Sequence, residues 1–193
     1  MLFNSFEFIF LFLPITLIVF FFIGRKTEQV KQQLPLMWLV LASLFFYGWW
    51  KPLNLPLIIL SILVNYSLGH LLGNVIDKVI IKKAIVFSGI LFNLALICYF
   101  KYANFLVRNI NQVIDTNFNL PSVVIPLPIS FFTFQQLAYL VDAYKGQTRE
   151  YNILKYMLLV CSFPQLFAGP IVHHKEVLPQ YEKASIHKFS KQT

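Results

Sequence analysis

Long apolar blocks with almost no internal charge are the feature that most constrains how this chain can fold. They occupy about residues 6–23, 34–50, 53–72, 84–100, 123–144 and 151–172. A transmembrane α-helix needs roughly 17–25 mostly apolar residues, and in lipid only a helix or a closed barrel satisfies its own backbone hydrogen bonds. The blocks therefore predict an all-α, polytopic membrane helical bundle with about five to six transmembrane or re-entrant helices.

The composition favours a membrane protein over a soluble one. Hydrophobic residues make up 58% of the 193-residue chain and charged residues only 12%, whereas a soluble domain is about half apolar and a quarter charged. The net charge is +8, but the basic residues stand at the ends of apolar blocks rather than among aromatic residues on one face. This placement argues against nucleic-acid binding and predicts contact with membrane lipid.

The basic residues also predict the orientation in the membrane. With the N-terminus outside, the first, third and fifth connections face the cytoplasm and carry Arg25, Lys26, Lys31, Lys78, Lys82, Lys83, Lys145 and Arg149. The opposite connections carry only Lys51, Lys101 and Arg108. Because cytoplasmic loops are enriched in lysine and arginine, the pattern predicts a multi-pass protein of the bacterial inner membrane with its N-terminus outside. No basic residue precedes the first block, which indicates a retained span rather than a cleavable signal peptide.

The last two blocks are interrupted by prolines and polar residues. The fifth contains Pro126 and Pro128 and then Gln135 and Gln136, and the sixth is broken by Pro164, Gln165, Gly169 and Pro170. Such residues are tolerated at membrane depth only against protein or a wet cavity. Adjacent glutamines cannot both face one partner, which favours a polar lumen. Ordinary interhelical hydrogen bonds and a simple kinked helix are the alternatives.

The break in the sixth block decides where the polar tail, residues 173–193, lies. If 151–172 re-enters and returns at its prolines, the tail with Lys175, Lys183, Lys188 and Lys191 is cytoplasmic. This version satisfies the charge rule, so we expect it over a full crossing. The segment Tyr102–Leu120 is more polar and has helical apolar spacing, which predicts an interfacial helix.

Few residues could carry chemistry on their own. His173 and His174 are candidates for general base work, although a histidine pair beside a lysine at a membrane edge is more often an interfacial feature. The two cysteines, Cys98 and Cys161, lie inside apolar blocks and are expected to be buried apolar residues rather than disulfide or metal ligands. No metal-ligand spacing is present in the sequence. From the residues alone, a channel, a transporter and a membrane enzyme all remain open.

Three stretches resemble the membrane-bound O-acyltransferase family. They are Ile125–Gly146 (IPLPISFFTFQQLAYLVDAYKG), Phe163–Gln180 (FPQLFAGPIVHHKEVLPQ) and Leu44–Lys51 (LFFYGWWK). The branch that they resemble is that of the alginate O-acetylase. The resemblance departs from the family pattern at Pro128, where glycine is usual, and at His173 and His174, where an arginine and an aromatic residue commonly follow Gly-Pro-Ile-Val.

The resemblance implies transfer of an acyl group from a cytoplasmic donor, through a funnel in the protein, to a hydroxyl on the far side. The expected donor is an acetyl thioester of coenzyme A or of an acyl carrier protein, with no bound cofactor. The expected acceptor is an extracellular polysaccharide such as alginate, and the expected partners are periplasmic or extracellular acetyltransferases. The candidate funnel-lining residues are Ser130, Thr133, Gln135, Gln136, Asp142, Gln165, Gly169 and Pro170.

The family's essential histidine lies in a later helix, so the resemblance places it beyond Thr193. Family members of this branch are more than twice as long, which predicts that these 193 residues are the N-terminal part of such an enzyme and inactive alone. The alternative is a non-enzymatic membrane protein, either transporter-like or a scaffold in a polymer-export complex.

Overall fold

The fold is that of a helical bundle, seen in a computed structural model that describes residues 3–26, 33–49, 51–75, 78–114, 129–147 and 152–163. Within these residues all regular secondary structure is helical, which confirms the predicted all-α class. The helices are α1 (Leu13–Lys26), α2 (Gln33–Gly48), α3 (Leu55–Asn74), α4 (Val79–Ile97), α5 (Ala103–Ile114), α6 (Ile129–Tyr144) and α7 (Ile153–Cys161). A π-helical stretch, Glu7–Phe12, runs directly into α1, and a 3-10 turn, Pro52–Asn54, leads into α3.

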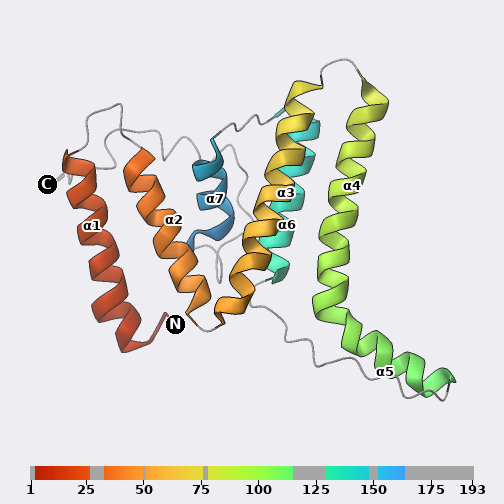
Figure 1. Cartoon of the computed structure of the whole chain (residues 1–193), viewed down its shortest axis with the longest axis horizontal. Coiled ribbons are helices and arrows are strands. Elements are labelled where there is room, and N and C mark those ends of the chain that lie inside the picture. Colours follow the sequence, from red (N-terminus) through yellow and green to blue (C-terminus); the bar gives the residue numbers. More distant parts are fainter. Residues whose placement is uncertain are drawn as a thin grey trace, which may run out of the picture.

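The long helices stand side by side across the molecule. Figure 1 shows α1, α2, α3 and α4 in sequence order, with α6 behind α3 and α7 between α2 and α3. The packing pairs agree, since α6 contacts both α3 and α4, α7 contacts α2, and α1 contacts α2. The helix that carries the fifth apolar block is therefore held between two earlier spans, although it comes much later in the chain.

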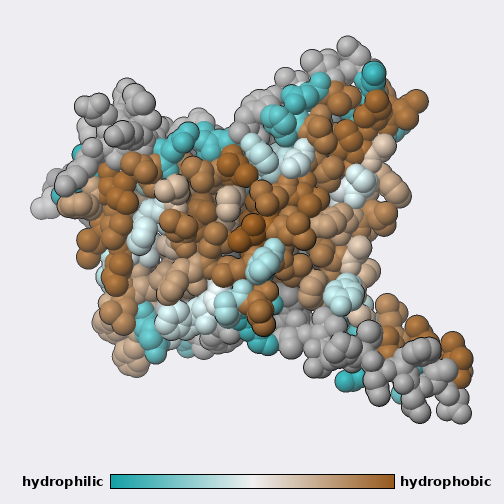
Figure 2. Space-filling view, in the orientation of Figure 1, coloured by the Kyte–Doolittle hydropathy of each residue, from teal (hydrophilic) through white to brown (hydrophobic). Residues whose placement is uncertain are grey.

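Among the described residues, three helical stretches are long and apolar enough to cross a membrane: Glu7–Arg25, Pro52–Asn74 and Val79–Ile114. Helix α2 is apolar but shorter. In Figure 2 the hydrophobic surface forms a band across the middle of the molecule, and hydrophilic residues gather toward both ends. Length, composition and surface together identify a membrane protein, because a band of exposed apolar side chains is stable only in contact with lipid.

The third stretch changes direction at its end. A π-helical turn, Cys98–Tyr102, joins α4 to α5, and Figure 1 shows α5 leaving the line of α4. Such turns bend helices because they interrupt the regular i to i−4 hydrogen bonds. Apolar side chains of α5, including Phe105, Ile110 and Val113, are exposed, as an interfacial helix requires. The interfacial position itself stays a prediction, and residues 115–120 lie outside the described part.

The core lies among α2, α3, α6 and α7. Its fully buried side chains include Ile58, Ile62, Phe132, Leu140 and Tyr156. A second cluster of phenylalanines, with Phe8, Phe12 and Phe46 at its centre, joins the start of the first span to α2. The first of these clusters packs α3 against α6, and these two helices carry most of the buried polar groups described below.

The fifth and sixth predicted spans can be compared with the observed helices only over the described residues. Residues 123–128, which carry the prolines of the fifth block, and residues 164–172, which carry the break in the sixth, lie outside the described residues. The tail 173–193 lies outside them as well. Helix α7 has 9 residues, a length of about 14 Å, which is too short to cross a core of about 30 Å. Whether 151–172 crosses or re-enters stays a prediction.

The expectation for the cysteines is correct for one and wrong for the other. Both thiols are free, Cys161 is buried, and Cys98 is exposed. Helix α4 packs against α3 and α6, and the exposed Cys98 follows its last residue. An apolar residue in a membrane span can face lipid as readily as protein, so apolar surroundings in the sequence do not predict burial.

Candidate functional site

Four buried polar side chains meet inside the bundle, and we call them the polar cluster: Ser61, Asn65, Asn93 and Gln136. Ser61 and Asn65 come from α3, Asn93 from α4 and Gln136 from α6. All four are 0% exposed. Asn65 lies near the middle of the Pro52–Asn74 stretch, which is long enough to cross a membrane, so we expect the cluster near mid-membrane depth.

The Gln136 side chain accepts two hydrogen bonds from α3. Its Oε1 atom accepts from Ser61 Oγ at 2.7 Å and from Asn65 Nδ2 at 2.5 Å. Hydrogen bonds between helices in a membrane contribute about 0.6 kcal/mol on average and up to about 1.7 kcal/mol. Gln136 is therefore tied to α3 through its oxygen.

The two asparagines join α3 to α4. Asn93 Nδ2 donates to Asn65 Oδ1 at 2.6 Å, and Asn65 Nδ2, whose two hydrogens are directed to Gln136 Oε1 and Ser61 O, lies 3.3 Å from Asn93 Oδ1. Each also donates to a carbonyl one turn earlier in its own helix, Asn65 to Ser61 O and Asn93 to Gly89 O. The amide nitrogens of both asparagines therefore have acceptors within the bundle. Gln136 is the member of the polar cluster whose amide nitrogen has none among the described residues.

The amide nitrogen of Gln136, Nε2, is buried and has no hydrogen-bond partner among the described residues. A buried donor without a partner costs about 1–3 kcal/mol, so such a group in a folded protein calls for an explanation, of which a functional role is one. The Tyr47 hydroxyl on α2 is likewise buried without a partner in the described part of the chain.

Small residues allow α6 to approach its neighbours. A Cβ atom added at Gly69 of α3 would lie 2.6 Å from Tyr139 Cζ, and one at Gly89 of α4 would lie 2.5 Å from Leu140 Cδ1. Close approach through small residues is the usual way that helices pack in a membrane, where the hydrophobic effect does not drive them together. Both glycines therefore hold α6 near enough for Gln136 to reach α3.

The other predicted residues of α6 lie around Gln136 in different environments. Thr133 is fully buried one turn earlier, and its Oγ1 donates to Ile129 O at 2.6 Å. Ser130 and Gln135 are half-buried. Asp142 is 8% exposed near the opposite end of the helix, and its backbone carbonyl accepts a hydrogen bond from Gln147 N. The adjacent glutamines thus differ, since Gln136 is in the polar cluster and Gln135 is not.

The remaining candidates cannot be placed. Gln165, Gly169, Pro170, His173 and His174 lie outside the described residues. In the described part of the chain, no group of three or more histidine, cysteine or acidic residues is arranged to hold a metal ion.

Sequence reasoning missed three members of the polar cluster. Ser61, Asn65 and Asn93 fall inside the predicted spans 53–72 and 84–100. The signal that could have found the asparagines is their place in otherwise apolar spans, because polar residues there usually face the bundle interior and mark functional sites. Ser61 gives a weaker signal, since a serine in a span can bond to its own backbone.

Comparison with known proteins identifies relatives over almost the whole chain. A peptidoglycan O-acetyltransferase of Helicobacter pylori is 36% identical over 94% of this chain. Probable alginate O-acetylases of Pseudomonas aeruginosa and Pseudomonas putida are each 32% identical, over 94% and 98% of it.

The chain spans well under half the length of these relatives: 39% of the Helicobacter pylori protein and 34% and 39% of the two Pseudomonas proteins. No family model and no solved structure matches the chain. Identity at this level over so much of the chain establishes common descent. The chain is therefore a homologue of part of these O-acetylases, in agreement with the resemblance of its motifs to the membrane-bound O-acyltransferase family.

Proposed function

We propose that this chain is part of an O-acyltransferase that moves an acetyl group to hydroxyls of an extracellular polysaccharide. The printed activities of its relatives, acetylation of peptidoglycan and of alginate, support this reaction class. Alginate, another exopolysaccharide and a cell-wall glycan are the candidate acceptors. The donor is an acetyl thioester, carried by coenzyme A or by an acyl carrier protein on the cytoplasmic side.

The observation that carries the proposal is the buried amide nitrogen of Gln136, which has no hydrogen-bond partner among the described residues. It belongs to the IPLPISFFTFQQLAYLVDAYKG stretch that resembles the family, and Tyr47 belongs to the LFFYGWWK stretch. A buried N–H donor suits the carbonyl oxygen of an acyl group, and preorganised donors of this kind stabilise charge that develops on oxygen. We propose that Gln136 Nε2 donates to the acyl carbonyl as it passes through the protein.

The charge distribution supports an inner-membrane protein with its N-terminus outside. In Figure 1 the last turns of α1, α3 and α6 and the first turns of α2, α4 and α7 lie at one end of the bundle. Basic residues within or next to these turns are Arg25, Lys78, Lys82, Lys83, Lys145 and Lys155. The positive-inside rule makes this end cytoplasmic.

The proposal also includes a catalytic histidine and a partner protein. The catalytic histidine of the family is expected beyond Thr193, so the described helices would line the passage for the acyl group rather than supply the reacting base. A periplasmic or extracellular acetyltransferase partner would receive the acetyl group or present the polysaccharide.

The test is a deletion of the gene in its own host, followed by complementation. Alkali-labile acetate would be measured in purified peptidoglycan and in secreted polysaccharide. We expect one of the two polymers to lose its acetate and the complete gene to restore it. Normal acetylation of both polymers would contradict the proposal, and a defect in polymer export alone would favour the scaffold alternative.

The role of Gln136 has a matched control in the neighbouring glutamine. Complementation with Gln136→Leu should restore about tenfold less acetate, since one hydrogen bond to a developing charge is worth roughly 1.4 kcal/mol or more. Gln135→Leu should restore the wild-type level. Equal activity of the two variants, at equal protein in the membrane, would exclude Gln136 as the donor to the carbonyl.

A further inference from the structure

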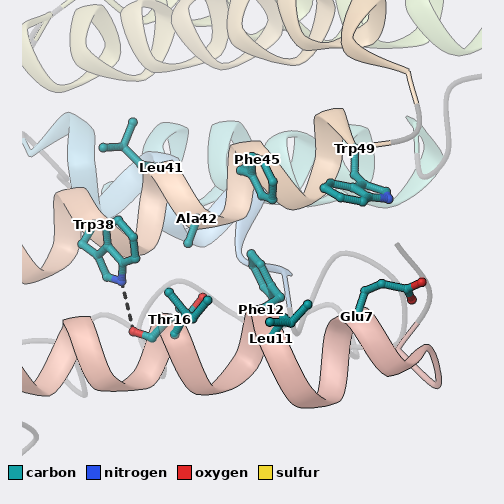
Figure 3. Close-up of a pocket in the computed structure, with 10 residues that line it drawn as sticks. Glu7, Leu11, Phe12, Thr16, Trp38, Leu41, Ala42, Phe45 and Trp49 are labelled. Atoms are coloured by element: carbon teal, nitrogen blue, oxygen red, sulfur yellow. Dashed lines mark hydrogen bonds between the residues drawn. The ribbon is translucent and has the colours of Figure 1, made fainter.

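A groove runs between the first span and α2, far from the polar cluster in sequence. Its volume is about 540 Å³, within the range of about 300–1,000 Å³ that is typical of small-molecule sites. Figure 3 shows Glu7 and Trp49 at one end of this groove and Thr16 and Trp38 at the other. At that far end Trp38 Nε1 donates to Thr16 O at 3.0 Å, which ties the two helices together.

The length of the groove matches one leaflet of a bilayer. Nine residue steps separate Glu7 from Thr16, which at about 1.5 Å each is roughly 14 Å. Half of a hydrocarbon core of about 30 Å is about 15 Å. Since Glu7 begins the span Glu7–Arg25, the groove runs from the membrane surface to about the bilayer centre.

The walls of the groove are apolar and open to the lipid side. Leu11, Ile15, Leu41 and Phe45 line it, and each side chain is between 51% and 59% exposed. In a membrane such side chains contact acyl chains rather than water. A lipid tail therefore fits the long axis and the chemistry of the groove.

The surface end of the groove carries a negative charge. Glu7 is exposed and forms no ion pair with the described residues. Trp49 lies at the same end, and tryptophan rings favour the headgroup level. A carboxylate there repels an anionic headgroup and attracts an ammonium group, while exposed charges of this kind contribute modestly.

We propose that the groove between the first span and α2 binds a phospholipid with a primary ammonium headgroup, phosphatidylethanolamine. One acyl chain occupies the groove from Glu7 to Thr16, and the ammonium group pairs with the Glu7 carboxylate. The site is separate from acyl transfer and does not depend on it.

Tryptophan fluorescence can test this, because two of the three tryptophans of the chain, Trp38 and Trp49, line the groove. A Trp50→Phe background leaves only these two. The purified full chain in detergent would be titrated with phosphatidylethanolamine or with phosphatidylglycerol, each brominated on its acyl chains to quench nearby tryptophan.

Half-maximal quenching should need about two- to fivefold less phosphatidylethanolamine than phosphatidylglycerol, the preference that one exposed ion pair gives. Glu7→Gln should remove the preference, whereas the matched control Glu28→Gln, which neutralises an acid after the other end of the span, should keep it. Leu41→Phe, which narrows the groove from an exposed position, should weaken quenching by both lipids. Equal quenching by the two lipids in the parent, or a preference that survives Glu7→Gln, would overturn the proposal.

Discussion

At the scale of single residues, the two adjacent glutamines show how far sequence reasoning reaches. Their position inside an apolar run predicts that at least one avoids lipid, since an unpaired amide in hydrocarbon is costly. The structure buries Gln136 against Ser61 and Asn65 and leaves Gln135 half-buried. The oxygen of Gln136 makes the interhelical hydrogen bonds that were one of the two alternatives. Its nitrogen has no partner among the described residues, so a polar lumen, the other alternative, stays a prediction.

The energetic share of these bonds can be measured by replacing each glutamine with leucine. Gln136→Leu should lower the free energy of unfolding by about 1 kcal/mol, since it removes two hydrogen bonds but also an unsatisfied donor. Gln135→Leu should change it by less than about 0.5 kcal/mol. Reversible unfolding in mixed micelles gives both values. An equal loss in both variants would mean that the polar cluster contributes nothing specific to stability.

At the scale of elements, the position of α6 determines whether the polar cluster forms, because α6 carries Gln136 and packs against α3 and α4. Its packing against α3 and α4 relies on Gly69 and Gly89, where side chains of α6 occupy the space of a missing Cβ. The end of α6 is marked by Gly146, whose φ of 68° is the left-handed conformation that glycine adopts freely. There Gly146 N donates to Ala143 O and Gln147 N donates to Asp142 O, the paired bonds of a Schellman motif.

The close contact between Gly69 and Tyr139 predicts that an alanine at residue 69 is destabilising only while the Tyr139 ring is present. Alanine normally stabilises a helix by about 1 kcal/mol relative to glycine. Here Gly69→Ala should instead destabilise by about 1–3 kcal/mol, because the new Cβ overlaps the buried Tyr139 ring.

In a Tyr139→Leu background the overlap is gone, and Gly69→Ala should then be neutral or stabilising. The comparison is a double-mutant cycle on thermal or micellar unfolding. Destabilisation of similar size in both backgrounds would show that the contact between α3 and α6 is not what excludes a side chain at residue 69.

At the scale of the whole molecule, the direction of the helices follows from charge. The end of the bundle that carries Lys82, Lys83 and Lys145 is proposed to face the cytoplasm, and the end with Lys101 and Arg108 the outside. Cys161 is buried, so thiol labelling can report on introduced cysteines once the exposed Cys98 has been replaced by serine.

In that background, Arg108→Cys should react with a membrane-impermeant maleimide in cells whose outer barrier has been opened. Lys145→Cys should react only after the inner membrane is made permeable. The two positions serve as controls for each other, since both lysine and arginine are exposed in the structure. Labelling of Lys145→Cys before permeabilisation would reverse the proposed orientation.

The sequence by itself determined that the chain is a helical membrane protein, because the length and apolar content of its blocks leave few other ways to satisfy the backbone. It also carried the family resemblance, through motifs on α2 and α6. Only the tertiary structure decided which polar residues meet. Asn65 and Asn93 are 28 residues apart, and Asn65 and Gln136 are 71 apart. Polar residues in a span indicate the side that avoids lipid, but they do not show which helix that side packs against. That choice comes from the packing of α6 between α3 and α4, which brings Asn65, Asn93 and Gln136 together.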